Sequence, residues 1–258
     1  LPSEENIGFG RACNRAAGLA RSPFIFLLNT DAHLVEDSVR IMLEDLEQHG
    51  DCGALGCRLL DAGGQVEPSA ACFPDLLRLV AGRDRLTRLL RTRFPALARR
   101  LTYFWTEAEL QTPRTVDWCI GAALMLRREA FAAVGGFDPR FFLYAEEMDL
   151  CRRLKHAGWT VRYTPETTVH HQRAASSGGS LAPERVAAVA AGQRLYYRRH
   201  HGRLGALFLG AAEVLASVVK SVFWRLAALV ASGPERRERR ERALWHSRYL
   251  GNYWKRRY

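Results

Sequence analysis

The sequence predicts an α/β protein with a mixed sheet flanked by helices and a helical appendage at its C-terminal side. Residues 23–29 form a short apolar run between Pro23 and Asn29-Thr30-Asp31, which is typical of a fully buried strand in a parallel sheet. Residues 35–49 repeat apolar side chains at helical spacing, and residues 53–60 read as a second strand. Strands that alternate with helices in this way indicate the α/β class.

The other elements are shorter. Asp61-Ala62-Gly63-Gly64 predicts a turn, and Gly135-Gly136 closes a helix. The expected order is a helix over 6–18 ending at Gly18, a strand over 116–126, a helix over 127–134, a helix over 146–156 and a strand over 160–163.

Two domains are expected. Residues 1–180 form the first, within which the arginine- and leucine-rich stretch 73–112 is a basic helical insertion; residues 181–258 form a basic helical tail. Residues 204–232 are long and apolar enough to raise the question of a membrane span. Because Glu213 and Lys220 interrupt this run, an amphipathic helix that lies on a membrane or packs on the protein is favoured over a span.

Composition narrows the function classes. The 258 residues carry a net charge of +11, which favours anionic partners such as nucleotides or a membrane surface. Nucleic acid is disfavoured as a partner, because the basic residues form no recognisable nucleic-acid-binding module with exposed aromatics. None of the six cysteines forms a CxxC pair, so buried, reduced thiols of a cytosolic protein are expected rather than disulfides or a zinc site.

The first candidate site is Asn29-Thr30-Asp31, directly after the predicted strand. Ligands gather at the carboxyl ends of strands in open α/β sheets, and a carboxylate there can hold a divalent cation against a diphosphate. Asp31 can equally cap the next segment or make a turn, and both interpretations stay open.

The second candidate is Glu146-Glu147-x-Asp149, at the start of a predicted helix. One acid can take a proton from an acceptor hydroxyl while a neighbour tunes it. Alternatively, the acids stabilise the helix N-terminus and Asp149 pairs with Arg153.

Three weaker patterns remain. His170-His171 follows a predicted strand and Pro165, and imidazoles there are either metal or acid–base groups or simply structural. Trp118 with Gly121 and Ala122 permits either close approach of a ligand or tight strand packing. The charged run 235–242 indicates a solvated helix first and a contact with an anionic surface second.

In this order the segments resemble the family-2 glycosyltransferases of the GT-A fold, most closely the rhamnosyltransferase-like branch that builds cell-surface polysaccharides. The resemblance covers about 170 residues. Each motif is a weak signal by itself, but together, in this order, the motifs are specific. They are Asn6-Ile7-Gly8-Phe9-Gly10-Arg11-Ala12-Cys13-Asn14, Leu27-Leu28-Asn29-Thr30-Asp31, Val116-Asp117-Trp118-Cys119-Ile120-Gly121-Ala122, Gly136-Phe137-Asp138, Phe141-Phe142-x-Tyr144-x-Glu146-Glu147-x-Asp149, Gly158-Trp159, Pro165, and His170 with Ser176.

The resemblance implies metal-dependent transfer of a sugar from a nucleotide-diphosphate donor to an acceptor hydroxyl, usually with inversion. Asp31 then matches the family's metal-binding acid, with Thr30 where proline is common, and His170 can contribute to the Mg²⁺ or Mn²⁺ ion or the diphosphate. Glu147 matches the catalytic base, with Glu146 and Asp149 as helpers. Asn6, Gly8, Asn29, Trp118, Gly121 and Ala122 fall on substrate-binding positions.

The basic insertion and the amphipathic tail suit an anionic bilayer, so a saccharide or lipid-linked saccharide acceptor and a cytoplasmic protein peripheral to the inner face of the plasma membrane are expected. A Gln-x-x-Arg-Trp motif of processive synthases is absent from the expected place, so single-sugar transfer is predicted. Because the family's opening strand–helix–strand precedes the Asn6-x-Gly8 segment, the chain is expected to be part of a longer reading frame with an incomplete nucleotide pocket. The alternative function is a non-catalytic remnant that binds sugar or membrane.

Overall fold

The computed structural model describes residues 4–35, 37–75, 78, 93–172 and 183–253. The chain divides into two compact units. The first is built from Leu1–Phe73 with Thr102–Ser176, and the second from Pro74–Leu101 with Ser177–Tyr258. Ser176 and residues 79–92 of the basic insertion lie outside the described residues.

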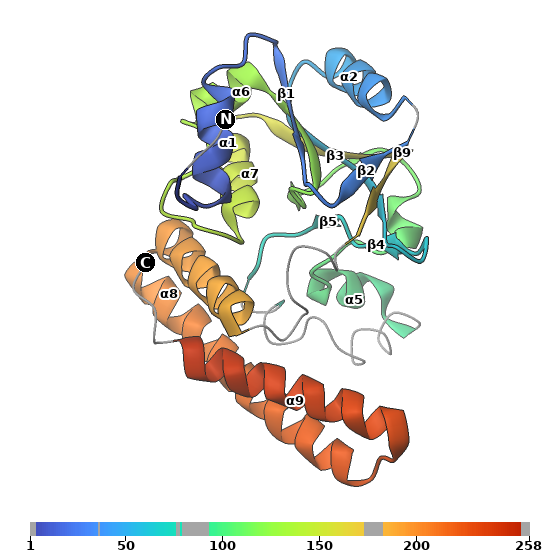
Figure 1. Ribbon diagram of the computed structural model, residues 1–258, viewed down its shortest axis with the longest axis vertical. Helices are drawn as coiled ribbons and strands as arrows, with labels where there is room; N and C mark the ends of the chain where they lie inside the picture. The colour runs from blue at the N-terminus through green and yellow to red at the C-terminus, as the bar shows by residue number, and fades with distance from the viewer. Residues whose placement is uncertain (1–3, 36, 76–77, 79–92, 173–182, 254–258) are drawn as a thin grey trace. The chain divides into compact units, whose positions relative to one another are not determined.

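The first unit contains a mixed sheet, as the sequence predicts (Figure 1). Strands β3 and β9 run parallel, and every other pairing in this sheet is antiparallel. Its main strands lie in the order β1 (Phe24–Leu28), β8 (Ala123–Arg127), β3 (Cys52–Leu60), β9 (Thr160–His171) and β2 (Ala32–Leu34), while β4 (Val66–Glu67) pairs with β3 and β6 (Arg114–Thr115) with β9. A two-stranded sheet joins β5 (Ala70–Ala71) to β7 (Trp118–Cys119).

Helices cover both faces of the sheet. Leu55, Cys57 and Leu59 of β3 point toward the apolar side of α2, whereas Gly56 points the other way, toward Cys119. An added Cβ at Gly56 would lie 2.6 Å from the Cys119 side chain, so β3 and β7 pack together without one. The helices of this unit are α1 (Phe9–Ala17), α2 (Ser38–Gln48), α6 (Arg128–Ala133) and α7 (Glu146–His156), with a 3₁₀ turn η1 (Glu107–Leu110).

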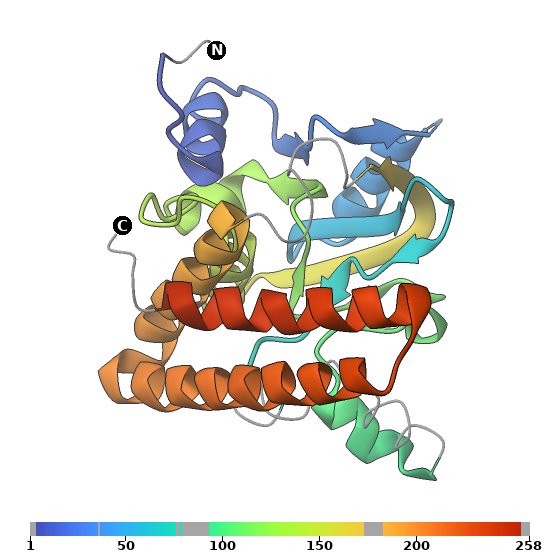
Figure 2. The same cartoon turned by 60° about the horizontal axis from the view of Figure 1, so that its bottom comes forward.

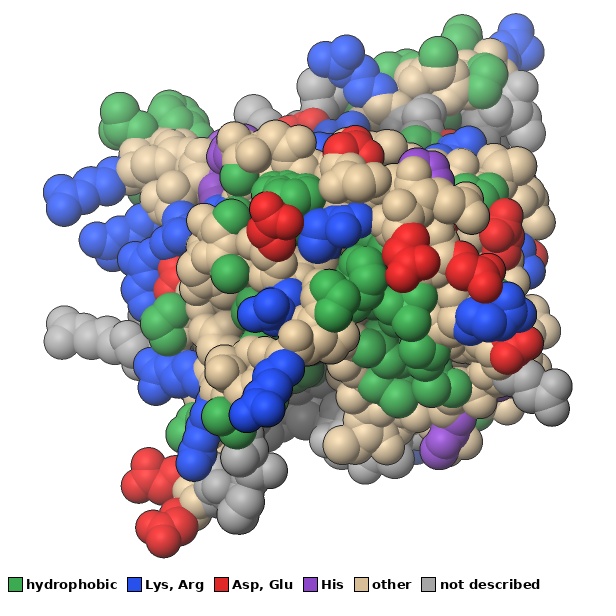
Figure 3. Space-filling view, turned by 90° about the horizontal axis from the view of Figure 1, so that it is seen from above, with side chains coloured by type: hydrophobic (Ala, Val, Ile, Leu, Met, Phe, Trp, Pro, Cys, Tyr) green, Lys and Arg blue, Asp and Glu red, His purple; other side chains and the backbone are tan. Residues whose placement is uncertain are grey.

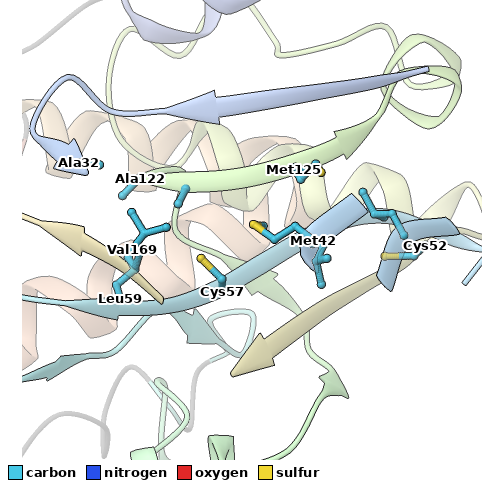
Figure 4. Close-up of a cluster of buried hydrophobic side chains, with 11 residues drawn as sticks. Ala32, Met42, Cys52, Cys57, Leu59, Ala122, Met125 and Val169 are labelled. Carbon is cyan, nitrogen blue, oxygen red and sulfur yellow. The ribbon is translucent and has the colours of Figure 1, made fainter. Parts of the chain in front are cut away.

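The apolar core beneath α2 links five elements, α2, β2, β3, β8 and β9 (Figure 4). Met42 and Leu46 of α2 are fully buried against side chains of β3, β8 and β9, among them Leu59, Met125 and Val169. This packing fixes the carboxyl end of β1 close to β8 and β9, because Ala32, just beyond that end, belongs to the same cluster.

The prediction of a fully buried strand in a parallel sheet at residues 23–29 is wrong. β1 pairs antiparallel with β8, and within the described residues it has no second neighbour, so Phe24, Ile25 and Phe26 stay partly exposed. A continuous apolar run shows that a strand has covered faces, but it carries no information on the direction of its partner. Figure 3 shows a hydrophobic patch on one face of the molecule, bordered by acidic and basic side chains.

Two further strand predictions need correction. The stretch 116–126 forms two short strands, β7 and β8, in different sheets. The strand predicted over 160–163 continues to His171, so the two histidines lie inside β9 rather than after it. Pro165 is accommodated because the register against β3 shifts between Cys57 and Arg58, and a proline is tolerated at such an irregularity.

The second unit contains α5 (Pro95–Leu101), α8 (Pro183–Leu229) and α9 (Gly233–Tyr253). Gly202, with φ of 67°, interrupts the helical backbone of α8 and divides it into two segments. The later segment and α9 lie side by side and form a helical hairpin (Figure 2). By length and composition, Ala187–Leu229 is the one described helix that could cross a membrane.

The six cysteines, all within the described residues, form no disulfide. Five are buried and Cys13 is half-buried, as expected for structural thiols. Burial raises the pKa of Cys57 to about 12 and that of Cys13 to about 11, which leaves both as unreactive thiols at neutral pH.

Candidate active site

The acidic pair Glu146–Glu147 begins α7 immediately after a strained turn. Tyr144 and Ala145 both have positive φ, 69° and 71°, a conformation that costs a residue with a Cβ about 1–2 kcal/mol. Two such residues in a row place the acids at the first turn of the helix. Strain of this kind is common at functional sites, where the surrounding structure maintains it.

Burial sets the electrostatics of this pair. Glu146 is buried and Glu147 half-buried, and Oε2 of each is enclosed without a hydrogen-bond partner within the described chain. Burial raises the pKa of Glu147, opposed by the backbone N–H groups of Glu147 and Gly121. The pKa of Glu146 is raised well above its usual value, first by burial and then by the neighbouring Glu147. A carboxylate held in this way is a stronger base than an exposed one.

Asp149 has a different environment. It is fully buried and binds Arg153, with Oδ2 2.8 Å from Nε and 2.7 Å from Nη2. The same guanidinium donates from Nη1 to the carbonyls of Val134 and Gly136, both at 2.7 Å. Asp149 therefore ties α7 to the loop that follows α6, which is a positioning role.

Gly121 and Ala122 connect the acidic pair to the end of β1. A Cβ added at Gly121 would stand 3.9 Å from Cβ and Oε1 of Glu147, so the glycine lies directly beside this carboxylate. The carbonyl of the next residue, Ala122, accepts a hydrogen bond from the N–H of Asn29 at 3.0 Å. The acids of α7 and the Asn29–Asp31 segment are thus neighbours through two consecutive residues.

Asp31 lies in a buried polar cluster with His171 and Glu67. Oδ1 of Asp31 is 3.4 Å from Nε2 of His171, and Oε2 of Glu67 is 3.1 Å from Nδ1 on the other side of the ring. Asn29 approaches the same Nε2 with its Nδ2 at 3.5 Å. All three charged or titratable side chains are about 8% exposed or less, so their electrostatic interactions are only weakly screened.

This cluster suits a divalent cation. If Nδ1 of His171 carries its proton toward Glu67, Nε2 presents a lone pair toward the Asp31 carboxylate, and these two acceptors can share a bound cation. Asp31 and His171 are then two protein ligands of types that such ions accept. Glu67 faces the opposite ring nitrogen, and among the described residues no three His, Cys, Asp or Glu side chains converge as a metal site.

The remaining predicted residues lie around these two clusters. His170 pairs in register with His33, and strand alternation turns its side chain to the face opposite His171. Trp118 is buried and donates from Nε1 to the carbonyl of Cys72 at 3.1 Å. Its ring packs near Tyr103 and Phe104, and this packing contributes to its burial.

Asn6 and Gly8 lie on the segment that leads into α1. Asn6 accepts the N–H of Gly8 through Oδ1 at 3.1 Å, and the N–H of Phe9 binds the carbonyl of Phe142 at 3.0 Å. Gly8 has φ of 84°, and a Cβ there would stand 2.6 Å from the Phe142 carbonyl oxygen. The glycine thus allows this segment to contact the loop that leads to Glu146.

Sequence reasoning missed Glu67, and it selected His170 rather than His171 without information on which ring lies beside Asp31. The dipeptide itself holds no such information, but a longer predicted strand would have placed the two rings on opposite faces. Glu67 lies on a two-residue strand after a turn, and no local pattern identifies it.

Known proteins identify the family. The model of the "Glycosyl transferase family group 2" matches residues 24–177, which is more than half of the chain. The chain belongs to this family. The matched range contains Asp31, Glu67, Glu147 and His171, so both clusters of the candidate active site fall within the family's domain.

Two curated relatives carry rhamnosyltransferase names. The chain is 35% identical over 187 residues to N-acetylglucosaminyl-diphospho-decaprenol L-rhamnosyltransferase of Mycobacterium tuberculosis, covering 66% of this chain and 57% of the relative. It is 25% identical over 166 residues to rhamnosyltransferase WbbL of Escherichia coli K12, covering 61% and 58%. The chain therefore spans less than two thirds of the length of either relative.

A solved structure supports the fold. The mannosyltransferase PcManGT from Pyrobaculum calidifontis, solved in complex with GDP-Man and Mn²⁺, matches with a TM-score of 0.53 and 13% identity over 100% of this chain and 70% of that chain. At this identity the likeness establishes the GT-A glycosyltransferase fold alone.

Proposed function

We propose that this chain carries the catalytic site of an inverting glycosyltransferase that moves one sugar from a nucleotide-diphosphate donor to an acceptor hydroxyl. The observation that carries the proposal is the link through Gly121 and Ala122. It joins a half-buried acid with a raised pKa, Glu147, to the Asp31–His171 pair beyond the end of β1. A base beside a binding site for a charged leaving group is the arrangement that such a transfer needs.

Glu147 is the proposed base. Its carboxylate would accept the proton of the acceptor hydroxyl as that oxygen attacks the sugar carbon, and the bond to the donor diphosphate would break on the opposite side. Burial and then the Glu147 charge raise the pKa of Glu146, so Glu146 would favour its neutral form beside the base. Asp149 holds α7 in place through Arg153.

Asp31 and His171 would hold Mg²⁺ or Mn²⁺, with Asn29 beside the His171 ring and His170 next to it in β9 but on the opposite face. The bound ion would neutralise charge on the leaving nucleoside diphosphate. Mg²⁺ is commonly held by one or two protein groups together with substrate phosphates, which agrees with two converging donors rather than a complete cage. Asn6, Gly8, Trp118 and Gly121 would line the space for the substrates.

The acceptor we propose is a saccharide on a lipid diphosphate, with the reaction on the cytoplasmic side of the membrane. The support is the name of the Mycobacterium tuberculosis relative, which specifies a decaprenol-linked acceptor and an L-rhamnosyl group. A rhamnosyl donor is the first to be tried on this chain.

The experiment is a transfer assay with UDP-, GDP- and dTDP-sugars and a polyprenyl-diphospho-N-acetylglucosamine acceptor. Glu147→Gln should lower the rate by about 10²–10⁴-fold, because general base catalysis contributes that much. Glu129→Gln, at an exposed acid of α6, is the matched control and should leave it unchanged. Retained transfer in Glu147→Gln would exclude this residue as the base, and no transfer from any donor would favour a non-catalytic sugar-binding role.

A further inference from the structure

The later segment of α8, from Arg203 to Leu229, presents large apolar side chains to solvent. Leu204 and Leu229, near its two ends, are 74% and 70% exposed. We call the following set the apolar stripe, since its members recur on one side of the helix: Leu204, Phe208, Leu215, Val222, Leu226 and Leu229. At 1.5 Å per residue the stripe is roughly 40 Å long. Single exposed leucines are common on soluble proteins, but a continuous apolar surface of this length indicates an interaction site.

The opposite side of the same segment is small and polar. Ser217 and Ser221 are buried there, and Oγ of Ser221 lies 2.9 Å from Oγ of Ser247 and 3.4 Å from the carbonyl of Ala243, both on α9. Small and hydroxyl-bearing residues form the seam between the helices, while the bulky apolar ones face outward. This is the reverse of a water-soluble hairpin and matches helices that pack together in contact with lipid.

The partner helix argues against a transmembrane span. α9 lies against this segment through charged side chains: Arg239 donates to the carbonyl of Ala227 at 2.9 Å, and the Arg242 guanidinium stands 4.7 Å from the centre of the Trp224 ring. A span by α8 would draw these arginines into the hydrocarbon, where charged groups are costly. One side of the hairpin must therefore remain in water.

We propose that the α8–α9 hairpin docks in the plane of an anionic bilayer, with the apolar stripe among the acyl chains of one leaflet. Between Arg203 and Arg248 the chain carries nine arginines and lysines against four glutamates. This excess is complementary to a negatively charged surface. It opposes the pairing of two stripes in a dimer, because two like-charged hairpins would then be brought together.

Vesicle flotation tests the proposal on the whole chain. The protein should float with vesicles of phosphatidylcholine and phosphatidylglycerol, and less with phosphatidylcholine alone or at high salt. Leu215→Glu with Val222→Glu should weaken the binding at least tenfold, with helicity by circular dichroism unchanged. Leu19→Glu, at a 66% exposed leucine of the first unit, is the control and should bind like the wild type.

Three outcomes would overturn it. The first is equal binding of the double variant and the wild type. The second is wild-type protein that resists extraction by alkaline carbonate, which would indicate a span. The third is a lipid-free dimer that the double variant converts to a monomer, which would make the stripe a contact between copies. None of them bears on sugar transfer, which is assayed separately.

Discussion

At the residue scale, two adjacent carboxylates share one buried environment, and this has a cost for folding. The pKa of Glu146 is raised in the folded protein, so the folded state holds its proton more tightly than the unfolded chain does. Stability is therefore lost as the pH rises from the ordinary carboxyl range through this raised pKa. The buried carboxyl of Glu146 therefore lowers the stability of the folded protein at higher pH, a cost that is common in active sites.

We predict that Glu146→Gln is more thermostable than the wild type at neutral and alkaline pH. The gain should shrink toward pH 4, where the wild-type carboxyl is already protonated. Thermal melts between pH 4 and pH 8 measure it, and Glu129→Gln, which is exposed, should show no such trend. A melting-temperature difference that does not change with pH would contradict the assignment of a raised pKa to Glu146.

At the element scale, the loop between α6 and the acids of α7 depends on Gly136. Its φ is 70°, and a Cβ there would stand 2.6 Å from Oδ1 of Asn14 and 3.1 Å from the Phe131 ring. Oδ1 of Asn14 accepts the N–H of Phe137 at 2.8 Å, so it cannot move away without losing that bond. Gly135 has a similar φ of 75°, but no atom of the described residues lies within 4 Å of its missing Cβ.

This pair separates backbone strain from steric overlap. Gly135→Ala should lower the free energy of unfolding by about 1–2 kcal/mol, the cost of a left-handed residue with a Cβ. Gly136→Ala should lower it by about 1–3 kcal/mol more, since the added methyl overpacks the contact with Asn14. Urea denaturation of both variants gives the difference, and equal losses would show that Asn14 does not constrain this loop.

Several helices, strands and turns can be predicted from the local sequence pattern alone. The bounds of α7 are those predicted for 146–156, because acids begin it, apolar residues recur at helical spacing and Gly158 follows its end. The strand at 53–60 and the turn at Asp61 are likewise local features. The direction of β1 and the length of β9 were not predictable, since both depend on pairing with strands distant in the sequence.

The same limit applies to the candidate active site. Asp31 and Glu147 could be chosen from the sequence because each lies at the junction of an apolar run and a polar segment. Glu67 could not, because its approach to His171 requires β4 and β9 to lie on either side of β3. The sheet decides which clusters meet, because the pairing of β1 with β8 brings Asn29 to the Ala122 carbonyl, next to Gly121.

At the scale of the whole molecule, the family domain, 24–177, contains both clusters, and most of the basic excess lies outside it. The basic excess is therefore associated with the C-terminal helices rather than with the acidic site. On this account the first unit performs the chemistry, and the hairpin of the second holds the protein at a membrane.

The central claim is that Asp31 and His171 form the metal-dependent donor site. Calorimetry with a panel of nucleoside diphosphates and Mn²⁺ tests it on the wild type, on Asp31→Asn and on the control Asp37→Asn, an exposed acid of the same unit. The account predicts Mn²⁺-dependent binding that Asp31→Asn weakens more than about tenfold and Asp37→Asn leaves intact. Binding that needs no metal, or that survives Asp31→Asn, would contradict it.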